Sequence, residues 1–237
     1  MSAPTVIREP DGGAIAVRAA RIFEELVTAA IDARGIAHVA LAGGTTPAAT
    51  YELIALPRWS AVELWFGDER CVRPDDPESN YRMVAQTLLA HAAGAVVHRI
   101  EGELGAEAAA SAYETELRGR LAMDAAGMPL LDLVLLGIGE DGHTASLFPN
   151  DRALDARGVA AVAVHHAPKP PPDRVSLSLE QLRAARACVL LASGSGKAEA
   201  LAGALGPPTR EVPSSLLARE KLTVIADAEA LSKTGDA

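Results

Sequence analysis

The sequence predicts an α/β fold in which helices flank a mostly parallel sheet. Short apolar runs alternate along the chain with segments of helical periodicity, the arrangement expected of consecutive βαβ units. Apolar residues make up 49% of the 237 residues and aromatic residues only 3%, so the core must be aliphatic, as in a Val/Leu/Ile sheet packed against helices. We find no internal repeat and no convincing linker, and we therefore expect residues 1–237 to form a single domain.

The strands and helices follow from these patterns in chain order. Residues 11–34 predict an amphipathic helix, because apolar residues recur at every third or fourth position and Gly35 follows as a stop. Further helices are expected at residues 48–56, 81–93 and 106–126, and one that begins at 193–197. Strands are expected at residues 36–42, 62–66, 96–100, 130–136, 159–165, 175–179, 187–192 and 222–226. The alternation Val-Ser-Leu-Ser-Leu at 175–179 predicts a half-exposed strand, and the apolar run at 130–136 predicts one buried on both faces.

The acidic composition narrows the possible partners. A formal charge of −9 disfavours nucleic acid and anionic membranes, which attract clustered Lys and Arg. The polar residues 1–10 do not resemble a signal peptide, and no apolar run approaches the ~20 residues of a membrane span. The cysteines, Cys71 and Cys188, are too few for a disulfide framework and are expected to act as small buried hydrophobes. We expect a cytoplasmic protein, monomeric or a small homo-oligomer, without nucleic-acid or membrane partners.

Polar or glycine-rich loops follow four of the expected strands. These loops are residues 43–47, 67–70, 137–143 and 193–197. In a parallel sheet the carboxyl ends of the strands lie along one edge, so residues far apart in the sequence can converge there. We therefore expect a common site at this edge.

Two of these loops are candidates for binding a phosphate. In Gly-Gly-Thr-Thr-Pro, Thr46 is the expected N-cap and Pro47 the first helical residue; Gly43 and Gly44 let an anion approach the backbone, and the hydroxyls of Thr45 and Thr46 add donors. An ordinary well-capped turn is the alternative.

The loop Ser-Gly-Ser-Gly-Lys is not a Walker A loop, because its spacing differs. Lys197 at a helix start is unfavourable for the helix dipole unless an anion lies nearby, so it is either a second phosphate contact or a solvated surface lysine. Arg70 and Arg174 are candidate anion clamps; the alternatives are a surface salt-bridge cluster for Arg70 and a charge at the rim for Arg174.

Asp141 and His143 are the candidate catalytic residues. A histidine can act as a general base near neutral pH, and a neighbouring carboxylate can fix its tautomer. Ser146 lies in no nucleophile elbow, and neither HExxH nor paired CxxC occurs, so no serine triad and no metal site are expected. Attack by a water molecule that the histidine activates is the simplest chemistry compatible with these groups.

Five stretches, taken together and in order, resemble the 6-phosphogluconolactonases within the larger glucosamine-6-phosphate isomerase/deaminase family. They are LAGGTTP, GDERCV…DPESNYRM, LLGIGEDGHTASLFP, PPPDRVSLSL and GSGK. The resemblance spans nearly the whole chain. It implies a modified Rossmann-like sheet in a single domain, and hydrolysis of the phosphosugar lactone 6-phosphoglucono-δ-lactone to 6-phosphogluconate in the pentose phosphate pathway, with no cofactor.

The resemblance also implies roles for individual residues. His143 would activate water and Asp141 would orient it. The 6-phosphate would be bound by Gly43, Gly44, Thr45 and Thr46, with help from Lys197. Arg70 and Arg174 would contact phosphate or other substrate oxygens.

Two positions separate this chain from the deaminase branch. Deaminases carry a glutamate immediately before the proline of the DGH motif, where this chain has Phe148. They also tend to have Tyr after the Asp-Glu pair, where this chain has Arg70. Cys71 and Asn150 are small departures from the lactonase pattern. The alternatives are a sugar-phosphate isomerase or deaminase, and a non-catalytic phosphosugar sensor.

Overall fold

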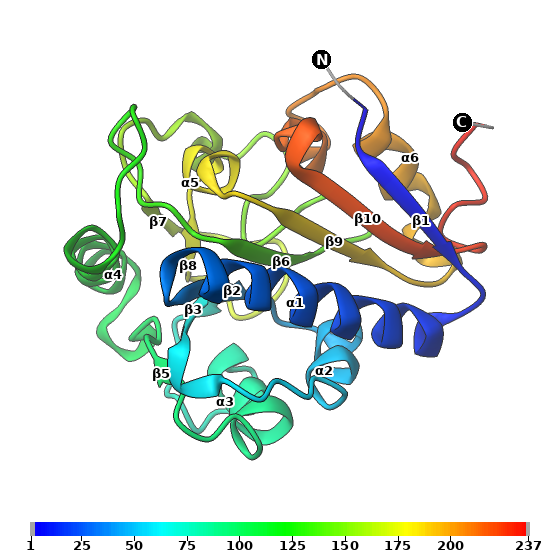
Figure 1. Cartoon of the computed structure of the whole chain (residues 1–237). Coiled ribbons are helices and arrows are strands. Elements are labelled where there is room, and N and C mark those ends of the chain that lie inside the picture. Colours follow the sequence, from blue (N-terminus) through cyan, green and yellow to red (C-terminus); the bar gives the residue numbers. More distant parts are fainter. Residues whose placement is uncertain (1–2, 236–237) are drawn as a thin grey trace.

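The strands form two sheets in the computed structural model, which describes residues 3–235 (Figure 1). Within those residues the larger sheet is parallel, with strand order β1-β10-β9-β6-β2-β3-β5. Its strands are β1 (Thr5–Glu9), β2 (Ala37–Leu41), β3 (Val62–Phe66), β5 (Val96–Val97), β6 (Leu133–Gly137), β9 (Cys188–Ala192) and β10 (Leu222–Asp227). The smaller sheet is antiparallel and contains β4 (Asp68–Arg70), β8 (Arg174–Leu177) and β7 (Ala161–Val164).

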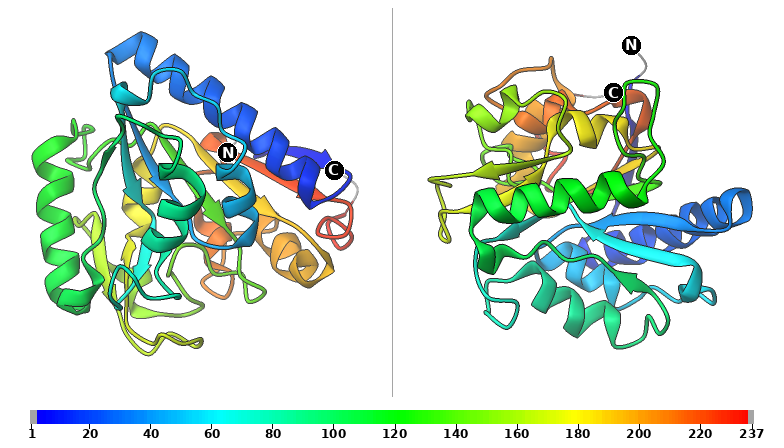
Figure 2. Two further views of the ribbon diagram at one scale, coloured as in Figure 1. Left: turned by 90° about the horizontal axis from the view of Figure 1, so that it is seen from below. Right: turned by 90° about the vertical axis from the view of Figure 1, so that its left-hand side faces the viewer.

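Helices cover both faces of the larger sheet, as the predicted fold class requires. They are α1 (Gly12–Arg34), α2 (Thr45–Tyr51), α3 (Asn80–Val84), α4 (Ala106–Arg120), α5 (Leu179–Ala184) and α6 (Ala198–Leu205). Helices α1 and α6 lie on opposite faces, and α4 lies at the end of the molecule that holds the smaller sheet (Figures 1 and 2). The α/β prediction with a mostly parallel sheet is confirmed.

Helix α1 begins and ends where the sequence predicts. The side chain of Asp11 accepts a hydrogen bond from the Ala14 N–H at 2.8 Å and so caps the first turn. Gly35 ends the helix at φ 80°, a left-handed conformation that costs little only for glycine.

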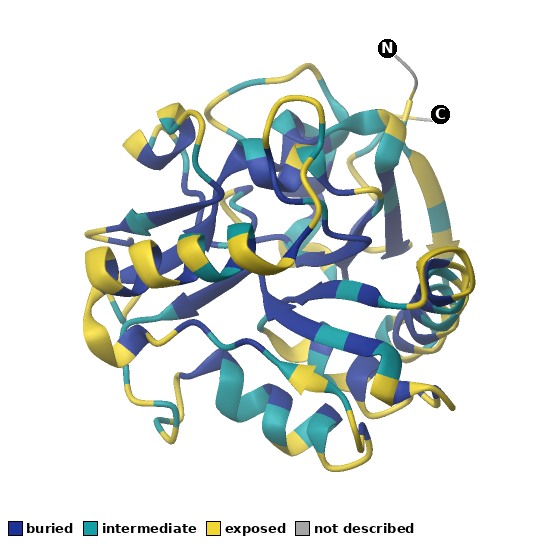
Figure 3. Ribbon diagram, turned by 60° about the vertical axis from the view of Figure 1, so that its left-hand side comes forward, coloured by how far each residue is buried: buried dark blue, intermediate teal, exposed yellow. Residues whose placement is uncertain are grey.

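The core is aliphatic and lies between the sheet and its helices. Strands of the larger sheet are mostly buried, whereas the helices around it carry many of the exposed residues (Figure 3). Tyr113 of α4 is buried, and its hydroxyl bonds both the N–H and the C=O of Phe66, at 2.7 and 3.0 Å. This contact fixes the end of β3, from which the loop at 67–70 departs.

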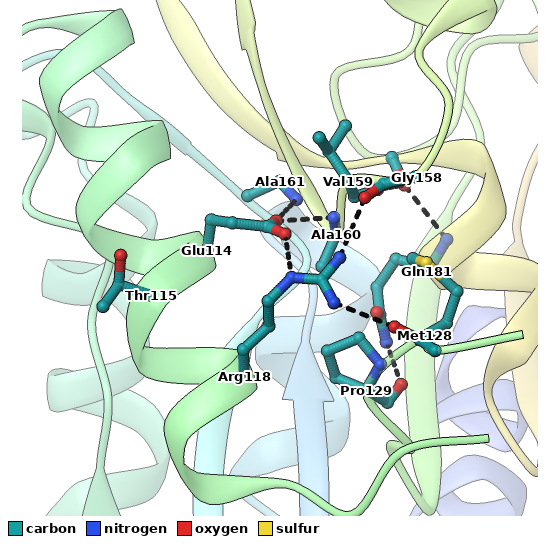
Figure 4. A network of polar contacts seen from close by, with 12 residues as sticks. Glu114, Thr115, Arg118, Met128, Pro129, Gly158, Val159, Ala160, Ala161 and Gln181 are labelled. Carbon is teal, nitrogen blue, oxygen red and sulfur yellow. Dashed lines mark hydrogen bonds and ion pairs between the residues drawn. The ribbon is translucent and has the colours of Figure 1, made fainter.

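Helix α4 also holds the smaller sheet in place through a polar network (Figure 4). The Glu114 carboxylate accepts hydrogen bonds from the N–H groups of Ala160 and Ala161, at 2.5 and 2.8 Å, where β7 begins. Arg118 donates to Glu114 at 2.5 Å and to the carbonyl of Gly158 at 2.9 Å. The smaller sheet is therefore anchored at one side, which matters because its two other strands carry Arg70 and Arg174.

Several predicted boundaries differ from the structure. The strand expected at 96–100 pairs only over Val96–Val97, and the helix expected at 106–126 ends at Arg120. After it, the Asp124 side chain accepts bonds from the N–H groups of Ala126 and Met128 and forms a turn in place of a further helical turn. The strand expected at 130–136 begins only at Leu133, and the helix expected at 81–93 is interrupted after Val84 by a wider π turn.

The prediction of a half-exposed strand at 175–179 is wrong. All four residues of β8 are buried, because the strand pairs on both sides, with β4 and β7, and packs against α4. Strand β1 was not predicted, since its alternating polar residues lie at an exposed sheet edge and resemble a polar terminus.

Candidate active site

The four predicted loops meet in one pocket, which has a volume of about 230 Å³. It opens at the carboxyl ends of β2, β6 and β9, as expected for a parallel sheet. Its lining includes Gly43, Gly44, Thr45, Thr46, Asp68, Arg70, Asn80, Gly139, His143, Ala145, Lys169, Arg174, Ser193 and Lys197. All the predicted site residues except Asp141 line it. Asp141 contacts the ring of His143 but is not part of the lining.

The turn after β6 presents His143 to the pocket. Gly142 adopts φ 83°, and a Cβ atom on Gly139 would lie only 2.1 Å from Nδ1 of His143, so both glycines are required for this backbone path. The Gly139 N–H donates to the His143 carbonyl at 2.9 Å, and the Thr144 hydroxyl donates to the Gly137 carbonyl at 2.9 Å. The imidazole is thus carried by a turn whose two ends are tied together.

Asp141 engages one nitrogen of the imidazole and leaves the other available. Its Oδ1 lies 2.5 Å from Nδ1 of His143, whereas no residue of the described range 3–235 hydrogen-bonds Nε2. Partial burial works to raise the pKa of Asp141, but the hydrogen bond and the charge of His143 outweigh it and lower the pKa to about 2. Asp141 is therefore ionised near neutral pH and favours the tautomer that has its proton on Nδ1.

Phe148 connects this histidine to one of the arginines. Its ring lies 4.6 Å from the imidazole of His143, centroid to centroid, and the guanidinium of Arg174 lies 5.5 Å above the same ring. Phe148 is buried, so its ring acts as a spacer between the His143 imidazole and the Arg174 guanidinium, both of which line the pocket.

The two arginines lie side by side on neighbouring strands of the smaller sheet. Arg70 and Arg174 are directly opposed partners of β4 and β8. Arg174 is 5% exposed and donates to the carbonyls of Lys169 and Pro171; burial, followed by the charge of Arg70, lowers its pKa. Arg70 donates to the carbonyl of Glu78, and its buried Nε has no hydrogen-bond partner within residues 3–235. Opposed like charges are unfavourable in a sheet, and an anion between them would relieve the repulsion.

The loop after β2 begins its helix earlier than predicted. Gly44, at φ 102°, occupies the cap position, and α2 starts at Thr45; the predicted cap at Thr46 and helix start at Pro47 are therefore wrong. Only glycine adopts that conformation readily, which moves the start of the helix forward. Gly43 is equally constrained, because an added Cβ would lie 2.0 Å from the Asn80 side chain. Both threonines consequently lie in the first turn, whose N–H groups lack intrahelical partners.

The loop after β9 brings Lys197 to the lining of the pocket. No carboxylate of residues 3–235 lies within 4.0 Å of its ammonium group, and it precedes α6 directly. The N–H groups of Gly194 and Ser195, in contrast, donate to the carboxylates of Asp227 and Glu229. The loop therefore offers the pocket a cationic side chain, while two of its backbone donors are already engaged.

Three pocket residues were missed by sequence reasoning. Asp68 is buried and accepts hydrogen bonds from the Ser146 hydroxyl at 2.6 Å and from the Asn80 amide at 3.2 Å. Asp68 could have been noticed in the GDER loop and Lys169 in the proline-rich loop. Asn80 lies in the DPESNYRM stretch that carries part of the family resemblance, but its amide was not singled out as a site residue. With Lys169, four cationic side chains surround a pocket in a chain of net charge −9.

Two further findings concern ligands and membranes. Among residues 3–235 there is no group of three or more His, Cys, Asp or Glu side chains that could bind a metal ion. In the same part of the chain, none of the helices combines the length and the apolar character needed to cross a membrane.

Known proteins share this fold and these motifs. Residues 10–226 match the family described as glucosamine-6-phosphate isomerases/6-phosphogluconolactonase. The 6-phosphogluconolactonase of Streptomyces coelicolor is 39% identical over 79% of this chain and 77% of its own, and that of Mycobacterium tuberculosis is 35% identical over 94% and 96%. The solved structure of 6-phosphogluconolactonase from Trypanosoma brucei superposes with a TM-score of 0.85 and 27% identity, over 98% of this chain and 99% of that one. The chain thus belongs to the glucosamine-6-phosphate isomerase/6-phosphogluconolactonase family, as the sequence motifs predicted.

Proposed function

We propose that this protein is a 6-phosphogluconolactonase, which hydrolyses 6-phosphoglucono-δ-lactone to 6-phosphogluconate. The observation that carries the proposal is the imidazole of His143, which lines a pocket together with four cations. Asp141 engages its Nδ1, and no residue between 3 and 235 hydrogen-bonds its Nε2. A base next to a cationic pocket suits a substrate that has both an anionic phosphate and a carbonyl group open to attack by water. Its relatives of known name support the same substrate.

The proposed reaction begins with a water molecule next to Nε2 of His143. The imidazole removes a proton as the water oxygen attacks the lactone carbonyl, and Asp141 stabilises the imidazolium that forms. The C–O bond of the ring then breaks, and the same proton passes to the departing ring oxygen. His143 returns to its neutral form, and the product is a hydroxy acid that ionises to the carboxylate.

Two groups of pocket residues are assigned to the remaining parts of the substrate, the phosphate and the lactone oxygens. We assign the 6-phosphate to the backbone of Gly43 and Gly44, the first turn at Thr45 and Thr46, and the ammonium of Lys197. Arg70 and Arg174 lie on the wall of the smaller sheet, and Phe148 joins that wall to His143. We assign them to the lactone oxygens, where a guanidinium would stabilise the developing oxyanion.

The same proposal covers the setting of the reaction. We propose that the chain acts as one domain in the cytoplasm, on a small phosphosugar lactone, without a cofactor and without nucleic-acid or membrane partners. Phe148 supports the lactonase over the deaminase, because it fills with a buried ring the place where deaminases have a carboxylate.

The experiment is a lactone hydrolysis assay with the substrate generated in place from glucose 6-phosphate. The lactone also opens spontaneously, so the rate above background is compared between wild type and His143→Ala. We expect a large acceleration by the wild type that falls close to background in the variant. No acceleration by pure wild-type protein would refute the lactonase, and ammonia release from glucosamine 6-phosphate would identify the deaminase activity in its place.

A further inference from the structure

A buried carboxylate outside the pocket holds the loop that carries Lys197. Asp227, the last residue of β10, is 5% exposed and lies beside the end of β9. It accepts hydrogen bonds from the Ser193 hydroxyl at 2.7 Å and from the Gly194 N–H at 2.9 Å. A further bond from the Ala230 N–H, at 2.8 Å, ties the same carboxylate to the chain after β10. Asp227 thus joins two segments that the parallel sheet brings side by side.

The loop has one more attachment of the same kind. Glu229 accepts a hydrogen bond from the Ser195 N–H at 3.2 Å. Gly194 adopts φ 88°, and its carbonyl accepts from the Lys197 N–H at 3.0 Å, which starts the turn that carries the lysine. The direction in which the lysine leaves the backbone therefore depends on where the carboxylates hold residues 193–195.

The charge of Asp227 strengthens this attachment. Burial works to raise the pKa of Asp227, but the hydrogen bonds from Ser193, Ala230 and Gly194 outweigh it, so the pKa lies below its ordinary value. The group is ionised at neutral pH, and hydrogen bonds to an ionised acceptor are stronger than those between neutral groups. Asp227 is not among the residues that line the pocket, so its effect on a ligand must pass through the loop.

We propose that Asp227 is a positioning residue that fixes the 193–197 loop so that the Lys197 ammonium faces the phosphate of the substrate. This role rests on the proposed function, in which Lys197 contacts the phosphate. Asp227 itself neither touches the substrate nor transfers a proton. Its loss therefore weakens phosphate binding and leaves the chemical step intact.

The test is a double-mutant cycle of Asp227→Asn with Lys197→Ala. Affinity for 6-phosphogluconate is measured by calorimetry, and KM and kcat by lactone hydrolysis. We expect Asp227→Asn alone to weaken binding and raise KM about five- to tenfold, with kcat within about twofold. This is less than the loss of a full hydrogen bond to a charged group, because the lysine is displaced and not removed. In the Lys197→Ala background the same substitution should change affinity by less than about twofold, because the group it positions is gone.

A matched control separates positioning from general stability. Asp132 is also buried, at 7% exposed, and accepts a hydrogen bond from the His38 N–H at 2.9 Å. It directly precedes β6 and so lies at the amino ends of the parallel strands, whereas the pocket lies at their carboxyl ends. Asp132→Asn should lower Tm without raising KM. Should Asp227→Asn fail to fold, Glu229→Ala at an exposed position serves the same cycle, with an expected effect of about two- to threefold.

The outcomes are distinct. Equal loss of affinity with and without Lys197 would overturn the positioning role, and so would an unchanged affinity in the single variant. If the wild type binds 6-phosphogluconate and shows the coupling but does not hydrolyse the lactone, the lactonase assignment fails and the positioning role stands.

Discussion

His143 and His98 differ in the number of carboxylates that engage them. Within the described part of the chain, a single carboxylate, Asp141, contacts Nδ1 of His143, and Nε2 has no hydrogen-bond partner. At His98 both ring nitrogens are engaged: Nδ1 lies 2.6 Å from Glu116, and Nε2 lies 2.9 Å from Glu63. The His98 ring is also stacked on Trp65 at 4.0 Å and is almost fully buried.

This difference shows why one histidine suits chemistry and the other suits structure. A general base needs a nitrogen with a free lone pair within reach of the proton that it removes. His143 meets that condition, and its single carboxylate orients the ring. At His98 both nitrogens are already committed to carboxylates, so the ring connects α4 to β3 and offers neither nitrogen to water or substrate.

The largest expected effect is on kcat in His143→Ala. Because the variant lacks the group that removes a proton from water, kcat should fall about 10²- to 10⁴-fold, with little change in affinity for 6-phosphogluconate. Steady-state lactone hydrolysis measures the first quantity and calorimetry the second. If the variant retained more than a tenth of the wild-type kcat, His143 would not be the general base, and it would not differ in function from His98.

The next effect concerns the cation above Phe148. Arg174→Ala should raise KM about 10- to 100-fold, as expected for the loss of a hydrogen bond between charged groups worth about 1.5–3 kcal/mol. Arg174→Lys keeps the charge and is the matched control; it should recover only part of the loss, because Lys cannot reproduce the planar fork that also binds the carbonyls of Lys169 and Pro171. A KM equal to that of wild type in Arg174→Ala would place the substrate away from this wall.

The contact between Asp141 and His143 could be predicted from the sequence because it is local. Asp141 and His143 are two residues apart in one glycine-rich turn, so no knowledge of the fold was needed to bring them together. The convergence of the four loops followed from a single property, the parallel direction of the strands. The sequence-based expectations for the individual roles remain predictions that the substitutions test.

Contacts between distant segments could not be predicted in the same way. The pairing of Arg70 with Arg174 depends on an antiparallel sheet that neither the strand expected at 159–165 nor the alternating pattern at 175–179 revealed. Local patterns report which face of a strand is apolar, and they do not report which strand lies next to it. Asp227 was missed for the same reason, since the partners it holds are 33 and 34 residues away.

A smaller effect on activity is expected when Asp141, the carboxylate that engages His143, is replaced by a neutral side chain. Asp141→Asn should lower kcat/KM at pH 7 about tenfold, near the lower end for a charged hydrogen bond because Asp141 is partly exposed to water. With a pKa of about 2, Asp141 stays ionised from pH 4 upward in the wild type, so its own titration does not shape the profile there. A kcat/KM equal to that of wild type in the variant would contradict the pairing of Asp141 with His143.

At His98 the expected effect is on stability and not on activity. His98→Gln should reduce the free energy of unfolding by about 1.5–3 kcal/mol, because the single amide nitrogen of glutamine can take the place of only one of the two ring nitrogens. Tm should fall about 3–12 °C. Lactone hydrolysis below the new Tm should stay within about twofold of wild type. A loss of kcat without a loss of Tm would show that His98 contributes to the reaction.

The smallest effect is expected at His165. This residue tests whether the number of carboxylates or the burial of the ring makes a histidine structural. Its ring nitrogens lie 2.9 Å from Asp173 and 2.7 Å from Glu107, as at His98, but its side chain is 40% exposed. The hydrogen bond of Asp173 and then that of Glu107 raise the pKa of His165 above its ordinary 6.5. A raised folded-state pKa adds stability that is complete below pH 6.5 and is lost as the pH rises through the folded value.

His165→Asn should therefore lower Tm only at the acid side. The expected loss is below about 1 kcal/mol, as for other solvent-exposed ion pairs. Thermal unfolding of wild type and variant at pH 5.5 and pH 9 measures it: the difference in Tm should be present at the lower pH and absent at the higher one. An equal difference at both values would mean that the side chain acts through packing and not through its charge. Two carboxylates would then be insufficient to make a histidine structural, and burial against Trp65 would be what distinguishes His98 from His143.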